Sequence, residues 1–249
     1  MKRVALCLGT WLMVGTAFAI DHNNLDAGRP LNFEDAYSIG FGERVFESGF
    51  GVTTGRRMRP GYALDLEFKN GFAMNRDIGI GLTTGLAGRD RRISVDGIEL
   101  SYFHGIMRET TRHPGIGHRI DVHVPTNGDE GVDLLFRGVV TQSVGQFDKL
   151  HLNGDVELHT SAPAGTRDTV FGLTLGYSRP LGYPRRFDQT LLASVGWRQD
   201  PDENESSYFE VGVGLRQQMT PRSVFDIGLV SRLGRSPSHQ VRVGYSYAF

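Results

Sequence analysis

The chain ends on a run in which every second residue is apolar or aromatic. Val241, Val243, Tyr245, Tyr247 and Phe249 alternate with small or polar residues. A period of two places successive side chains on opposite faces of a β-strand. The run therefore predicts a strand with one apolar face and one polar face.

The same alternation recurs along most of the chain after residue 42. About twelve segments show it, and short stretches rich in polar residues and proline separate them. We predict strands at 43–54, 61–69, 77–87, 96–107, 117–125, 132–144, 150–160, 169–180, 187–199, 206–219, 222–233 and 238–249. The faces of segment 132–144 are less clear than those of the others.

An even number of alternating strands is typical of barrels in bacterial outer membranes. Hydrocarbon offers no hydrogen-bond partners, so a sheet can cross it only when it is closed. The hydrophobic content of 39% and the mean hydropathy of −0.27 fit such a barrel, because only alternate residues would face lipid. We therefore predict an all-β fold, a transmembrane antiparallel β-barrel over residues 43–249. A soluble β-sandwich built from the same strands is the alternative.

The first residues have the pattern of a secretory signal peptide, which we place at 1–19. Lys2 and Arg3 precede an apolar stretch at 4–18, and residues 17–19 form a small-x-small cleavage site. The pattern predicts export and, together with the barrel, a location in the cell outer membrane. Outer-membrane lipids and the barrel-assembly machinery are then the expected partners.

Two other features concern the exported chain. The single cysteine, Cys7, lies inside the predicted signal peptide, so no disulfide is expected after cleavage. Residues 20–42 precede the first strand, and we expect them to form a periplasmic extension or a plug in the lumen. The chain has 33 glycines, many of them within predicted strands, where glycine permits bends and close packing.

The polar faces of the predicted strands carry charges of both signs. Buried charges must pair or stay hydrated. These faces therefore predict either a paired network that fills a narrow lumen or a hydrated, charge-lined passage for a small solute. The residues expected to line the lumen are Glu47, Asp65, Glu67, Asp155, Glu157, Arg198, Glu210, Arg216 and Arg242. At the membrane surface, we expect Tyr245, Tyr247 and Phe249 to form the signal for membrane assembly.

Motifs for catalysis are weak in this sequence. Ser101 with His104, and Ser238 with His239, are the candidate pairs for a lipid hydrolase, but neither lies in a nucleophile motif. We therefore predict no catalytic residue and no enzymatic activity.

Motifs for cofactors, metals and nucleic acids are also missing from the sequence pattern. His151, Asp155, Glu157 and His159 share one strand face, but an extended strand would spread them over about 27 Å, too far for one ion. No nucleotide fingerprint or zincin motif is present, and the net charge of −1 comes without a basic face. We predict no cofactor, no metal and no nucleic-acid partner.

Several short motifs resemble a known family. They are the stretch Arg29–Ala36 followed by Phe46–Gly49, the strand end Val124–Gly128, and His151–Gly154 after a short turn. They are similar to outer-membrane proteins named for the MetA pathway of phenol degradation, which are often labelled transporters. Asn127 is an insertion relative to the family's strand end. The resemblance implies a barrel of about twelve strands and passage of small organic molecules, with aromatic ones as candidates, and it brings no catalytic residues.

These observations together predict a passive outer-membrane channel or transporter for small solutes, aromatic or hydrophobic molecules among the candidates. A non-conducting barrel with a structural or interaction role is the first alternative, and a lipid-modifying enzyme is the second.

Overall fold

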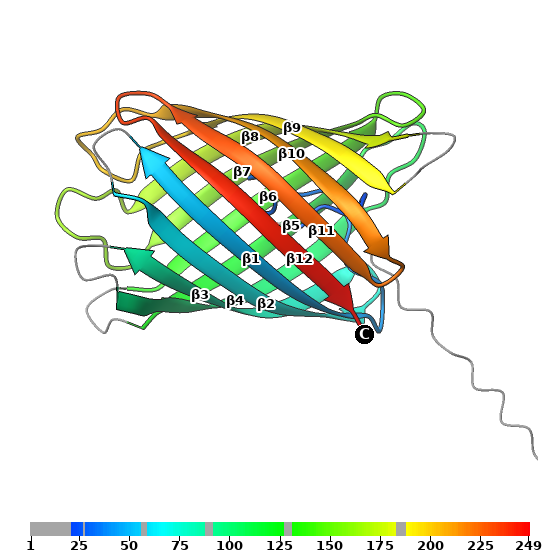
Figure 1. Ribbon diagram of the computed structural model, residues 1–249, viewed down its shortest axis with the longest axis horizontal. Helices are drawn as coiled ribbons and strands as arrows, with labels where there is room; N and C mark the ends of the chain where they lie inside the picture. Colours follow the sequence, from blue (N-terminus) through cyan, green and yellow to red (C-terminus); the bar gives the residue numbers. More distant parts are fainter. Residues whose placement is uncertain (1–20, 27, 56–58, 88–91, 127–130, 183–187) are drawn as a thin grey trace, which may run out of the picture.

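The computed structural model describes residues 21–26, 28–55, 59–87, 92–126, 131–182 and 188–249. Within these ranges, twelve antiparallel strands form one closed barrel, which confirms the predicted fold class (Figure 1). Each strand pairs with its neighbours in sequence, and β1 closes the barrel against β12. The predicted signal peptide, residues 1–19, lies outside the described residues. The strands are β1 (Arg44–Gly55), β2 (Gly61–Ala73), β3 (Arg76–Ala87), β4 (Arg92–Met107), β5 (Gly115–Pro125), β6 (Asp133–Ser143), β7 (Lys149–His159), β8 (Thr169–Leu181), β9 (Gln189–Arg198), β10 (Tyr208–Thr220), β11 (Ser223–Leu233) and β12 (Ser238–Ala248).

Two strands are each four residues longer than the alternation predicted. β2 continues to Ala73 because it joins β3 through a tight turn, in which Asn75 adopts a φ of 58°. β4 begins at Arg92, since a bulge lies where its pairing with β3 shifts between Thr83 and Thr84. The extra residue, Asp96, interrupts the period of two and hides the beginning of the strand from a pattern-based reading.

We name the two ends of the barrel by the strands that reach them. The proximal end carries the beginning of β1 and the end of β12, and the distal end carries the opposite ends of these strands. Eleven registered pairs, from Val45 with Ala248 to Gly55 with Ser238, join the two strands. Antiparallel pairing around the closed sheet therefore leaves no open strand edge among these strands.

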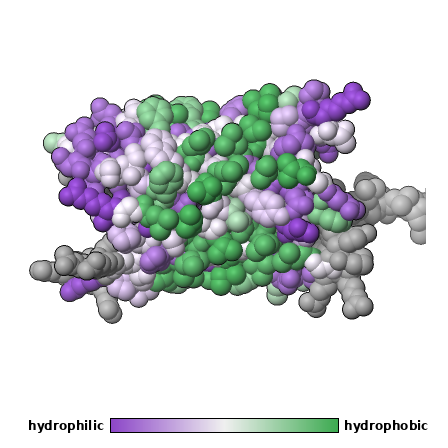
Figure 2. Space-filling view, turned by 90° about the horizontal axis from the view of Figure 1, so that it is seen from above, coloured by the Kyte–Doolittle hydropathy of each residue, from purple (hydrophilic) through white to green (hydrophobic). Residues whose placement is uncertain are grey.

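The outer face of the barrel is apolar. Successive outward residues of β8, Phe171, Leu173 and Leu175, each expose about half of their surface. Figure 2 shows an apolar band around the middle of the visible face, with hydrophilic residues toward both ends. Soluble monomers rarely expose continuous apolar patches of more than a few hundred Å², so this face fits lipid rather than water. Among the described residues, no helix has the length and apolar composition needed to span a membrane.

Aromatic contacts join the last residue to the rest of the sheet. The backbone N–H of Phe249 donates to the carbonyl of Arg44 at 3.0 Å. Its ring lies 5.9 Å from the ring of Phe68 and 6.3 Å from that of Tyr247, measured between centroids. The side chains of Tyr245, Tyr247 and Phe249 all lie on the outer face at the proximal end, where part of each stays exposed. Their role as an assembly signal remains a prediction.

Removal of the Phe249 ring should lower the yield of assembled barrel several-fold. Phe249→Ala keeps the backbone bond to Arg44 and loses both ring contacts. Heat-modifiable electrophoretic mobility of membrane fractions measures the folded portion. Phe209→Ala is the matched control, because Phe209 is also an exposed outward phenylalanine but lies at the distal beginning of β10. An equal folded portion in both variants would contradict a special role for the last residue.

Candidate functional site

A segment of the chain before β1 lies inside the barrel (Figure 1). We call residues 21–43, of which residue 27 lies outside the described ranges, the inner segment. Its apolar side chains Leu25, Leu31, Phe33 and Ala36 are each at most 4% exposed. The small buried apolar clusters of the lumen form where these side chains meet the inward faces of the strands.

The inner segment follows a path from the proximal end into the lumen and back. The backbone N–H of His22 donates to Gln218 near the proximal end of β10 at 2.9 Å. The chain then advances to Asn32, whose side chain reaches Glu210 and Arg242, both closer to the distal end. It returns along the opposite wall, where the N–H of Ile39 donates to Asp77 at the proximal end of β3 at 3.1 Å.

Arg29 anchors the outgoing limb of the inner segment. Its Nη2 donates to Oε2 of Glu47 at 2.9 Å and to Oγ of Ser246 at 3.0 Å, and its Nη1 donates to the carbonyl of Ser48 at 2.8 Å. The carboxylate of Glu47 also accepts from Nζ of Lys69 at 3.0 Å. The guanidinium therefore joins the segment to β1 and β12 across the seam where the barrel closes.

A second ion pair lies earlier on the same limb. Nη2 of Arg216, a fully buried side chain of β10, donates to Asp26 at 2.9 Å. Burial alone would raise the pKa of the Asp26 carboxyl, but the nearby cations of Arg216, Lys69 and Arg29 outweigh burial and lower this pKa. Asp26 therefore stays ionised, and the pair is a permanent contact between opposite charges.

The returning limb is held by Glu34. Its carboxylate accepts from Nε of Arg119 at 2.9 Å and lies 3.7 Å from Nη1 of Arg137. Arg137 in turn makes a bidentate pair with Asp155, at 2.7 and 2.9 Å. The Asn153 side chain completes this contact, because it accepts from the N–H of Glu34 and donates to its carbonyl.

Asp35 connects the two limbs to each other. Its carboxyl oxygens accept from the N–H of Leu25 at 2.8 Å and from the N–H of Tyr37 at 3.1 Å. Burial raises the pKa of Asp35 to about 8, against the lowering effect of these two hydrogen bonds. The segment is thus folded on itself as well as bound to the wall.

Glycines on the inward face provide the space that the inner segment occupies. A Cβ on Gly228 would lie 2.7 Å from the carbonyl oxygen of Pro30, and one on Gly49 would lie 2.8 Å from Cδ of Arg29. A Cβ on Gly176 would overlap the ring of Phe33. We call these three glycines the glycine seat. The sequence showed that glycine is frequent in the strands, but not that the glycines of the seat meet a second part of the chain.

The structure places all nine predicted lumen residues on inward faces, but they serve different contacts. Four of them, Glu47, Glu210, Arg216 and Arg242, bind the inner segment through the contacts described above. Three of the remaining five, Asp155, Glu157 and Arg198, form a chain of ion pairs with Arg137. The other two, Asp65 and Glu67, line a cavity.

The predicted set lacked several charged residues of this network, among them Asp26, Arg29, Glu34, Lys69, Arg119 and Arg137. Lys69 lies at the predicted end of its strand, and Arg137 belongs to the segment whose faces were unclear. Asp26, Arg29 and Glu34 belong to the inner segment and carry no strand periodicity. Their opposite charges in a short stretch before the first strand were the available signal.

The candidate catalytic pairs do not come together. Strand alternation turns Ser101 inward, where its hydroxyl donates to Glu67, while His104 lies on the outer face beside His118. The same alternation separates Ser238 from His239, which contacts the outward Ser231.

The histidines of β7 are also engaged elsewhere. His151 bonds to Thr141 and Ser178, and His159 bonds to Asp133. Over the described part of the chain, no group of three potential ligands is placed to hold a metal ion.

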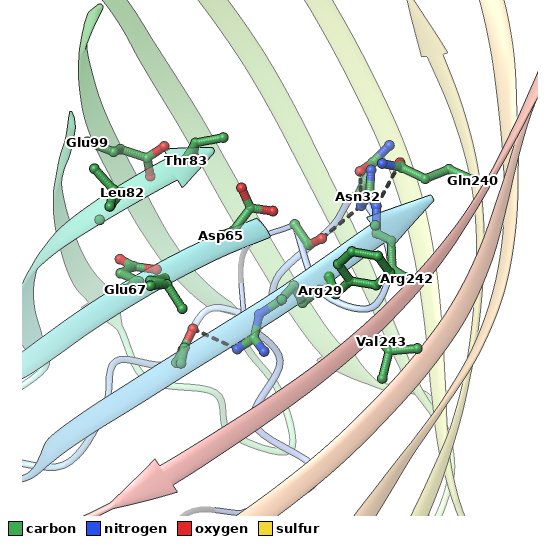
Figure 3. Close-up of a pocket in the computed structure, with 17 residues that line it drawn as sticks. Arg29, Asn32, Asp65, Glu67, Leu82, Thr83, Glu99, Gln240, Arg242 and Val243 are labelled. Atoms are coloured by element: carbon green, nitrogen blue, oxygen red, sulfur yellow. Dashed lines mark hydrogen bonds and ion pairs between the residues drawn. The ribbon is translucent and has the colours of Figure 1, made fainter. Parts of the chain in front are cut away.

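Hollow spaces lie on both sides of the inner segment. The first has a volume of about 300 Å³ and is bounded by the inner segment and by β1, β2, β3, β4 and β12. We call it the distal cavity. Figure 3 shows Asp65, Glu67 and Glu99 on one side of it, and Arg29, Asn32 and Arg242 on the other. The second, of about 500 Å³, lies at the proximal end between residues 36–41 of the segment and the turn at Asn75.

Comparison with known proteins identifies the fold. Searches of family profiles and of curated proteins find no match to this sequence, and the resemblance to the MetA-pathway family is not confirmed. Solved structures do match, and several of them are porins or channels. The COG4313 outer membrane channel from Pseudomonas putida F1 has a TM-score of 0.70 at 12% identity, over 90% of this chain and 100% of its own.

The two other structures have lower scores and cover somewhat less of this chain. The NanC porin has a TM-score of 0.60 at 12% identity, over 81% of this chain and 98% of its own. The KdgM porin in complex with disordered oligogalacturonate has a TM-score of 0.60 at 11% identity, over 82% of this chain and 99% of its own. At these identities the likeness concerns the fold: this chain has the closed barrel seen in outer-membrane channels and porins.

Proposed function

We propose that this protein is a passive channel of the outer membrane for small solutes, and that its inner segment narrows the passage. The apolar outer face and the closed sheet support a membrane location, with outer-membrane lipids as neighbours and the barrel-assembly machinery as the partner in folding. The solved channels with the same fold support a transport role.

The observation that carries the proposal is the presence of hollow spaces on both sides of a single strand-free segment. The distal and proximal cavities each include residues of the inner segment in their walls. We infer that the inner segment, which contributes to the walls of both cavities, is an obstruction along the axis. A continuous passage therefore depends on how much room this segment leaves.

The wall of the lumen also bears on the kind of solute. The distal cavity is lined mainly by charged side chains, amides and glycines. Such groups offer hydrogen bonds and charge rather than stacking surfaces. We therefore propose polar solutes in place of the aromatic or hydrophobic ones that the resemblance implied.

Conductance of the refolded protein in planar bilayers tests the proposal. We expect discrete single-channel steps in potassium chloride that appear only with folded, heat-modifiable protein. The Phe209→Ala variant, changed only on the lipid face, should give the same steps. Folded protein that inserts into bilayers and passes neither ions nor small solutes would overturn the channel proposal and favour a structural role.

A further inference from the structure

The distal cavity has an uneven distribution of charge. Its ionisable lining residues among those that the structure describes are four carboxylates, Glu47, Asp65, Glu67 and Glu99, and two guanidiniums. Three of the carboxylates lie in one row across the sheet. Glu47 on β1 is paired in register with Glu67 on β2, and Gly81 on β3 is paired with both Glu67 and Glu99 on β4. Gly81 has no side chain and leaves the space between the last two open.

Both guanidiniums of the cavity are already engaged. Arg29 donates to Glu47, Ser246 and the carbonyl of Ser48. Arg242 donates from Nε to Gln240 at 2.8 Å, and from Nη1 to the carbonyl of Gly28 at 2.7 Å and to Asn32 at 2.6 Å. Their hydrogen-bonding groups therefore hold the inner segment in place.

The carboxylates opposite them have fewer partners. Among the described residues, neither Asp65 nor Glu99 has a basic side chain within 4.0 Å. Asp65 has the hydroxyl of Thr83 as its neighbour, and Glu99 lies near two further carboxylates, those of Glu67 and Asp121. Carboxylates that face a hollow without a basic partner attract cations.

Glu47 adds an independent observation. Its side chain is 2% exposed and lines the same cavity. Its Oε2 binds Arg29 and Lys69, whereas its Oε1 has no hydrogen-bond partner among the described residues. A buried carboxylate oxygen without a donor is costly, so Oε1 is an acceptor beside the cavity that an added donor would satisfy.

We propose that the distal cavity is a binding and selectivity site for small organic cations that carry an ammonium group, an inference that rests on the proposed channel function. An ammonium group supplies the donors that Asp65, Glu99 and Oε1 of Glu47 lack, and a volume of about 300 Å³ admits a small molecule. The four carboxylates of the lining outnumber its two guanidiniums, so the formal charge of the lining is negative even though both guanidiniums keep their charge.

Two measurements test this site. The first is the ratio of potassium to chloride permeability, taken from the reversal potential in a salt gradient. The second is binding of putrescine to detergent-solubilised protein by calorimetry, with succinate as a dianion of the same chain length. We expect wild-type protein to prefer potassium and to bind putrescine but not succinate.

The double variant Asp65→Asn with Glu99→Gln removes two charges while keeping the side-chain shapes. It should lower the permeability ratio at least about threefold and weaken putrescine binding by a similar factor. Glu203→Gln, in the exposed loop after β9, is the matched control and should change neither value.

The outcomes separate this inference from the channel proposal. Conductance without cation preference, and no putrescine binding, would overturn the cation site and leave the channel intact. If the protein shows no conductance but binds putrescine, and the double variant loses this binding, the cation site is supported and the channel proposal is overturned. Succinate binding equal to putrescine binding would also overturn the inference, since it would show that the guanidiniums are available to ligands.

Discussion

Deletion of residues 21–40 will raise single-channel conductance several-fold. The deletion removes both limbs of the inner segment, whose residues line both the distal and the proximal cavity, so we expect it to join the two. The barrel strands begin at Arg44, so every registered pair of the sheet remains. Planar-bilayer recordings of the deletion variant beside wild-type protein give the measurement.

The deletion also leaves several wall charges without their partners. Arg216 loses Asp26, and Arg119 loses Glu34. Loss of one member of a buried pair costs about 3–5 kcal/mol when the other stays buried, but water can enter the emptied lumen and reduce that cost. Heat-modifiable mobility will show whether the variant is folded. A folded deletion variant with wild-type conductance would show that the segment is not the obstruction.

Gly176→Val will open the channel without removing any residue. A Cβ at this position overlaps the ring of Phe33, and the two methyl groups of valine extend the clash. Overpacking of this kind costs about 1–3 kcal/mol, which the inner segment can avoid by leaving its seat. We expect conductance to increase, as in the deletion variant, and transitions between conductance levels to become more frequent.

The neighbouring strand offers a matched control for this substitution. Gly154 of β7 faces outward, and a Cβ there meets nothing within 4 Å, so Gly154→Val adds the same atoms to the lipid face. It should leave conductance unchanged. Gly176→Val should also leave the conductance of the deletion variant unchanged, since that variant lacks Phe33. An equal effect in both backgrounds would mean that valine acts on the barrel wall itself.

The sequence predicted the architecture well because membrane strands obey a strict alternation. Ile80 and Leu82 point outward while Gly79 and Gly81 point inward, as the pattern required. The prediction missed the beginning of β4, where a bulge adds Asp96, and it left open the faces of the segment that contains Arg137. The bulge shifts the register without ending the strand, so it is visible only in the paired structure.

The candidate site was less predictable for a related reason. The alternation identified Glu47 and Arg216 as inward residues, but gave no information about what they meet. Their partners, Arg29 and Asp26, lie in a segment without regular structure, and ion pairs between distant parts of the chain have no local signature. The high glycine content was likewise visible in the sequence, but the contact of Gly176 with Phe33 was not.

The sequence by itself determined that the chain forms alternating strands, which residues face inward, and that both signs of charge meet there. Only the tertiary structure decided that the inner segment lies in the lumen and which charges it neutralises. The physical reason is range: alternation is set residue by residue along a strand, whereas the distribution of paired and free charges depends on which distant side chains share one enclosed space.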